Sequence, residues 1–138
     1  CWREKDSQFT VTRELVQLLM KRIKDYNPDE IFVTHDNEQH TDHNQASRLV
    51  FETLHKIPSK FTKPLVWMYE VWTPLQILDR IEDISEYVDI KRKAIQTYKS
   101  QCAVVNFEEA ILGLNRYRGE MHSWPGGNYA EVFKRMKI

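Results

Sequence analysis

The chain has 138 residues, of which 41% are hydrophobic and 29% are charged, a composition typical of a single globular domain covering residues 1–138. Lys plus Arg equals Asp plus Glu at 20 each, so the net charge of zero excludes an overall electrostatic footprint for nucleic acid. No apolar run approaches the roughly 20 residues that cross a bilayer, so we expect no membrane span.

An amphipathic helix and a short strand come first in the predicted order of elements. Apolar residues recur at helical spacing from Leu15 to Tyr26, and the turn-prone Asn27-Pro28 pair ends this pattern. Residues 31–33 are β-branched or aromatic, which predicts a strand.

A polar loop rich in histidine follows this strand. His35, His40 and His43 all lie in it, and the next helical pattern begins at or just after them, with Asp42 or Asn44 as its expected cap. In an α/β sheet, the order strand, loop, helix puts the loop at the carboxyl end of a strand, where open parallel sheets bind ligands. We therefore expect the functional site in this loop.

The second half of the chain contains one further clear strand and three helical patterns. Residues 65–72 form a nearly continuous apolar and aromatic run, which predicts a strand covered on both faces. Residues 77–84 fit either a third, shorter strand or an irregular segment. The expected helices are one over 90–101 capped by Asp89, one from a capping box at Asn106 to Gly119, and a last short one over 129–136.

The histidine spacing is compatible with a metal site. His40 and His43 are three residues apart, which in the first turn of a helix points both side chains to one side. Imidazole is a good zinc ligand, and a catalytic zinc takes three protein ligands and a water. Two other readings stay open: a polar capping cluster with Asp42, and a metal site that uses His35, His40 and His43 together.

Four segments, in this order along the chain, carry a family resemblance. The first is residues 40–43 (His-Thr-Asp-His) after the strand; the others are the aromatic run ending at Trp72, the 89–101 segment, and Arg118-Gly119 followed by residues 129–133. Together they resemble the LmbE-like, or PIG-L-type, metal-dependent N-deacetylases, whose second signature is commonly written H-P-D-H.

The resemblance implies a Rossmann-like α/β fold with a mainly parallel sheet flanked by helices. It also implies a hydrolase that uses Zn2+ or another divalent metal to remove an N-acetyl group from an N-acetylglucosamine-type glycoconjugate. By that resemblance His43 is a metal ligand, His40 is the proton donor or oxyanion stabiliser, and Asp42 orients His40. Trp72 and Arg118 are the expected substrate-binding residues.

The chain departs from the family pattern in two places. Thr41 stands where proline is common, and there is no A-H-P-D-D-type sequence, which in the family brings a metal-binding His and Asp and the general base. We therefore expect the carboxyl-terminal portion of such a domain, whose active site a missing amino-terminal segment or a complementing chain completes. The alternative is a non-catalytic binding or interaction module. The oligomeric state stays open.

The two cysteines favour a reducing compartment. Cys1 and Cys102 lie far apart, fit no paired-ligand spacing and are too few for a disulfide framework, so we expect a cytoplasmic protein. Because the chain opens at Cys1 and not at Met, we expect a processed amino terminus or a chain that begins inside a longer protein.

Overall fold

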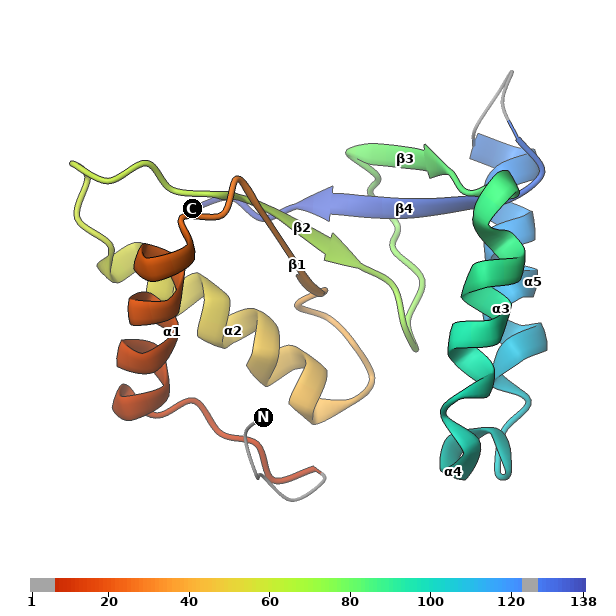
Figure 1. Cartoon of the computed structure of the whole chain (residues 1–138), viewed down its shortest axis with the longest axis horizontal. Coiled ribbons are helices and arrows are strands. Elements are labelled where there is room, and N and C mark those ends of the chain that lie inside the picture. Colours follow the sequence, from red (N-terminus) through yellow and green to blue (C-terminus); the bar gives the residue numbers. More distant parts are fainter. Residues whose placement is uncertain (1–6, 123–126) are drawn as a thin grey trace. The chain divides into compact units, whose positions relative to one another are not determined.

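The computed structural model describes residues 7–122 and 127–138, so Cys1 lies outside the described residues. The chain folds into an α/β structure (Figure 1). Its elements are, in chain order, α1 (Arg13–Tyr26), β1 (Glu30–Thr34), α2 (Thr41–Lys56), β2 (Leu65–Tyr69), β3 (Arg80–Asp83), the 3-10 helix η1 (Ser85–Tyr87), α3 (Val88–Gln96), α4 (Lys99–Cys102), α5 (Phe107–His122) and β4 (Ala130–Arg135).

The four strands form a mixed sheet in the order β1-β2-β4-β3. β1 and β2 are parallel, as a strand-helix-strand unit requires, whereas β2 and β4 are antiparallel, with Trp67 opposite Arg135. A mainly parallel sheet is therefore not confirmed. The chain divides into two compact units, one of residues 1–79 and 133–138 and the other of residues 80–132, and β4 runs from the second unit into the first.

In the first unit, α1 and α2 pack on the same face of β1 and β2 (Figure 1). Helix α1 confirms its prediction: Thr12 caps its amino terminus, and Asn27 ends it in the left-handed conformation, with φ of 43°. The core between helices and strands consists of Ile23, Val33, Val50, Leu54, Ile57, Val66, Met68 and Met136. This core packs β1 and β2 against the second half of α2, where Val50 and Leu54 lie.

In the second unit, α3 packs beside α5 (Figure 1). Arg92 of α3 forms an ion pair with Glu108 of α5, which also accepts a hydrogen bond from Gln96 at 2.8 Å. Helix α5 lies very close to the chain just before β4, because a Cβ atom at Gly119 would be 2.4 Å from the carbonyl oxygen of Asn128. Only glycine fits this position without a shift of the backbone.

Several predicted boundaries differ from the structure. The helix expected over 90–101 is two helices, α3 and α4, interrupted where Thr97 and Tyr98 form shorter, 3-10-type bonds to residues three positions earlier. Asp89 lies inside the first turn of α3 and is not its cap. Helix α5 continues beyond Gly119 to His122, because at Gly119 the missing side chain serves close packing and does not end the helix.

The prediction of a last helix over 129–136 was wrong, because this segment is the strand β4. Its backbone pairs with β2, and its apolar residues Val132 and Phe133 are buried. A short apolar segment of this kind suits a helix or a strand, and pairing with a distant strand decides between them. The open segment 77–84 contains a short strand, β3.

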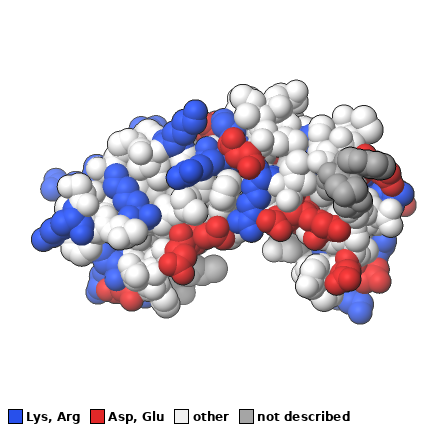
Figure 2. All heavy atoms as spheres, turned by 90° about the horizontal axis from the view of Figure 1, so that it is seen from above, with Lys and Arg blue, Asp and Glu red and all other residues white. Residues whose placement is uncertain are grey.

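Among the described residues, no helix is long and apolar enough to cross a membrane. Basic and acidic side chains are mixed on the face seen in Figure 2, in keeping with the zero net charge of the chain.

Candidate functional site

The end of β1, a short loop and the first turn of α2 bring the predicted histidines together. We call residues 35–43 the histidine loop. The hydroxyl of Thr34, the last residue of β1, donates a hydrogen bond to the carbonyl oxygen of His43 at 2.9 Å. The loop therefore returns to the carboxyl end of the strand from which it began.

The carboxylate of Glu38 is the centre of this loop, and its side chain is fully buried. It accepts hydrogen bonds from the backbone N–H groups of Val71 at 2.8 Å and Trp72 at 3.0 and 3.1 Å. Oε1 of Glu38 also lies 3.3 Å from Nε2 of His35, and Oε2 lies 3.6 Å from Nδ1 of His43. Because a buried carboxylate requires donors, these contacts tie the histidine loop to the segment after β2.

His35 is buried, and both of its ring nitrogens are engaged. Nδ1 accepts the backbone N–H of Asn37 at 3.1 Å, which places the proton on Nε2, and Nε2 lies 2.7 Å from the carbonyl oxygen of Thr73. A metal would have to displace one of these bonds. His35 is therefore a structural residue of the loop.

His43 has one buried and one accessible side. Its Nδ1 is buried and has no hydrogen-bond partner among the described residues, and the Glu38 carboxylate at 3.6 Å is beyond hydrogen-bond distance. The negative charge nevertheless favours the tautomer with the proton on Nδ1. The side chain as a whole is 27% exposed, and in this tautomer Nε2 keeps its lone pair.

His40, and not Asp42 or Asn44, caps α2, which begins at Thr41. Nδ1 of His40 accepts the backbone N–H of Asp42 at 3.3 Å, so its proton is on Nε2. The rings of His40 and His43 are 5.0 Å apart, as their spacing predicted. The Asp42 carboxylate accepts the backbone N–H groups of Ser7 at 2.8 Å and Phe9 at 3.1 Å, which holds the segment before α1 against α2.

Further hydrogen bonds stabilise the loop. The side-chain amide of Asn44 bonds both the N–H and the carbonyl oxygen of Glu38 at 2.7 Å, and the hydroxyl of Thr73 accepts the N–H of Gln39 at 3.0 Å. β2 ends at Tyr69 and does not reach Trp72 as predicted, because the N–H groups of the next residues donate to Glu38 and not to a strand.

The two predicted substrate-binding residues lie in different units. Trp72 is in the first unit, with its backbone held by Glu38 and its side chain partly exposed at 42%. Arg118 is in α5 of the second unit, where it is buried and its Nη1 lies 3.3 Å from Nε2 of His122.

A catalytic zinc needs a set of ligands that the described residues would have to bring together. A metal-binding histidine commonly donates its second ring N–H to a carboxylate; Nδ1 of His43 has the Glu38 carboxylate nearby, at 3.6 Å, without a hydrogen bond between them. Within residues 7–122 and 127–138, however, no three His, Cys, Asp or Glu side chains form a group that could hold a metal. Since catalytic zinc takes three protein ligands, these residues alone do not fit it, and the three-histidine site is not formed.

Comparison with known proteins shows a shared fold. No protein-family model and no curated protein matches the sequence. A conserved protein from Thermus thermophilus is similar in structure with a TM-score of 0.81 and 24% identity over 98% of this chain and 65% of its own. The N,N'-diacetylchitobiose deacetylase from Pyrococcus horikoshii has a TM-score of 0.76 and 21% sequence identity, and the match covers 96% of this chain and 55% of the deacetylase chain. GalB, the 4-carboxy-2-hydroxymuconate hydratase from Pseudomonas putida, has a TM-score of 0.72 and 18% sequence identity, and the match covers 93% of this chain and 60% of the GalB chain.

The chain thus spans between 55% and 65% of the length of these neighbours. At such identities the similarity shows the fold, in which one neighbour is a deacetylase and another a hydratase.

Proposed function

We propose that this chain supplies part of the active site of a zinc-dependent hydrolase that removes an N-acetyl group from an N-acetylglucosamine-type glycoconjugate. The observation that carries the proposal is His43 at the start of α2, with its Nδ1 turned toward the buried carboxylate of Glu38 and its other side accessible. The fold shared with a deacetylase of a diacetylated sugar supports it.

In this proposal each residue of the loop has a separate task. His43 binds the metal through Nε2, and Glu38 sets the tautomer and the direction of that ring. His40 carries a proton on Nε2, which suits the stabilisation of an oxyanion, and the imidazolium form of the ring would protonate a leaving amine. Asp42 is the proposed orienter of His40; its backbone N–H donates to Nδ1 of that ring, whereas its carboxylate accepts the N–H groups of Ser7 and Phe9. The other metal ligands and the general base come from polypeptide outside the described residues.

For the substrate, we propose Trp72 and Arg118 as contacts. Trp72 has an exposed aromatic ring directly after the segment that Glu38 holds, which suits stacking against a sugar ring. A guanidinium such as that of Arg118 donates several hydrogen bonds in a fixed plane, which suits sugar hydroxyl or anionic groups.

The alternative is a non-catalytic binding module, either a degenerate relative or a subunit that completes the site of another chain. The specific observation in its favour is that the described residues contain no three-ligand metal group. The two functions differ in whether a longer natural polypeptide containing these residues binds zinc and turns over substrate.

The experiment measures bound zinc and acetate release from N,N'-diacetylchitobiose for the longest natural polypeptide that contains this chain. We expect His43→Ala to lose zinc and activity, and His40→Ala to keep zinc but lose activity. His55→Ala, on the same helix but exposed, is the matched control and keeps both. Retention of zinc in His43→Ala contradicts the proposal, and absence of both zinc and turnover in the parent supports the binding module.

For the 138 residues alone we expect weak zinc binding and no efficient deacetylation, because they bring one proposed ligand. Titration of the isolated chain with zinc in a calorimeter measures this affinity. A tight one-to-one site with robust turnover in the isolated chain contradicts it.

A further inference from the structure

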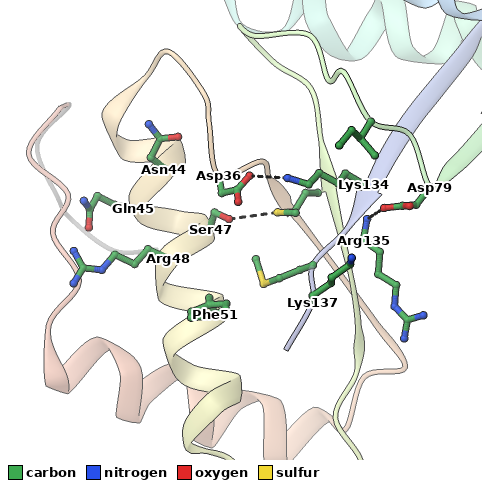
Figure 3. Close-up of a pocket in the computed structure, with 13 residues that line it drawn as sticks. Asp36, Asn44, Gln45, Ser47, Arg48, Phe51, Asp79, Lys134, Arg135 and Lys137 are labelled. Atoms are coloured by element: carbon green, nitrogen blue, oxygen red, sulfur yellow. Dashed lines mark hydrogen bonds and ion pairs between the residues drawn. The ribbon is translucent and has the colours of Figure 1, made fainter.

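A pocket lies beside the histidine loop, between α2 and the end of β4 (Figure 3). All of its lining residues belong to the unit of residues 1–79 and 133–138. Its volume is about 640 Å³, within the range of about 300–1,000 Å³ that is usual for small-molecule sites. The size suits one small organic ligand.

The floor and one wall of this pocket are apolar. Met68 and Met136 are buried at its base, and Figure 3 shows Ser47 of α2 pointing toward the strands, with Phe51 further along the same helix. Phe51 is 42% exposed and Ile77 is 65% exposed. Covering such side chains with an apolar group is favourable, at about 25 cal/mol for each Å² removed from water. A ligand with an apolar body therefore gains affinity here.

The charged lining residues have an excess of positive charge. They are Arg48, Lys134, Arg135 and Lys137 against Asp36 and Asp79, and Arg48 pairs with Glu52 outside the lining at 2.8 Å. Both carboxylates are engaged within the protein, since Asp36 pairs with Lys134 at 3.3 Å and Asp79 accepts the backbone N–H of Arg135 at 2.7 Å. Among the described residues, neither the guanidinium of Arg135 nor the ammonium of Lys137 has an ion-pair partner.

We propose that this pocket binds a small organic anion that consists of a flat apolar body and one carboxylate or phosphate group. The apolar body lies on Phe51 and Met136, and the anionic group binds Lys137. Hydrogen bonds between ionised partners are the stronger ones, so the anionic group sets the selectivity of the pocket. This binding site includes neither His43 nor a metal, so a test of it is independent of the test of the proposed hydrolase function.

Three probes with the same ring system test the proposal on the full 138-residue chain: 1-naphthyl phosphate, 1-naphthoate and the uncharged 1-naphthamide. Titration calorimetry gives the affinity, and amide chemical shifts give the location. We expect at least one anion to bind about tenfold more tightly than the amide, with shifts at the lining residues. If only 1-naphthyl phosphate binds, the pocket takes a phosphorylated ligand. If only 1-naphthoate binds, it takes a carboxylic acid. If both bind, the pocket recognises the negative charge that the two groups share.

Two variants and one control assign the contacts. Lys137→Gln should weaken binding of the anion several-fold and leave the amide unchanged, whereas Phe51→Ala should weaken all three probes. Lys60→Gln, which removes an exposed ammonium group outside the pocket lining, should change nothing. Equal binding of anion and amide, equal effects of Lys137→Gln and Lys60→Gln, or no binding of any probe overturns the proposal.

Discussion

Replacement of the buried Glu38 by Gln should loosen the histidine loop while keeping its shape. Gln has nearly the same size, but one carboxylate oxygen becomes an NH2 group that cannot accept a hydrogen bond. If the amide oxygen takes the place of Oε1, it still accepts from Val71, and the new NH2 group lies where Oε2 was, 3.0 Å from the N–H of Trp72 and 3.6 Å from Nδ1 of His43. The N–H of Trp72 then keeps its 3.1 Å contact with the remaining oxygen, but it also faces the new NH2 group, which is a donor.

The magnitude follows from these bonds. A hydrogen bond to a charged group contributes about 1.5–3 kcal/mol and a neutral one about 0.5–1.5 kcal/mol. The change weakens the bonds from Val71 and Trp72, so Glu38→Gln should lower the free energy of unfolding by about 2–3 kcal/mol. Glu52→Gln is the matched control, because Glu52 lies on α2 in an exposed pair with Arg48, where the expected loss is about 0–1 kcal/mol.

Urea denaturation measures both losses, and nitrogen NMR measures the tautomer of His43. In the parent, the carboxylate favours the proton on Nδ1, whereas the NH2 group that Glu38→Gln introduces donates to Nδ1 and moves the proton to Nε2. A loss no greater than that of Glu52→Gln, together with an unchanged tautomer, refutes the central role of Glu38.

Two further predictions concern the second unit. Gly119→Ala should destabilise the protein, because the added Cβ would lie 2.4 Å from a backbone oxygen. In the control Gly113→Ala, on the same helix, the added Cβ meets nothing within 4 Å, so this variant should gain about 0.5–1 kcal/mol of stability. Urea denaturation measures both variants, and equal midpoints would contradict the close packing at Gly119. Hydrogen bonds from the Ser85 hydroxyl, which has the larger effect, and from the Ser85 backbone N–H hold the pKa of Asp83 below its ordinary value of 3.8. The ionised carboxylate therefore stabilises the fold above that pH, and this stabilisation is lost as the pH falls through the lowered pKa. The stability gap between the parent and Asp83→Asn, measured by urea denaturation, should therefore shrink on acidification below about pH 4, and a constant gap counts against it.

The first part of the fold could be read from local patterns. The helical period up to Tyr26 and the strand at residues 31–33 are confirmed as α1 and β1, because a buried face leaves a regular spacing of apolar residues. The spacing of His40 and His43 also brought their rings together as expected. These features depend on residues within one or two turns of each other.

Features that depend on distant partners were missed. The local pattern of residues 129–136 predicts a helix, because the pairing of this segment with β2, more than 60 residues away, leaves no mark in its own spacing. The early end of β2 escaped prediction because its cause is the distant Glu38. A carboxylate three residues after His35 and five before His43 was the available signal for Glu38, since metal-binding histidines are commonly backed by carboxylates.

By itself, then, the sequence determined the histidine loop and its place after a strand. Only the tertiary structure decided which residues of the loop are structural and which face outward. His35 is held by Thr73 and Glu38 by Val71 and Trp72, all more than 30 residues further along the chain. A buried polar group must find its partners wherever the fold places them, and such partners cannot be read from neighbouring residues.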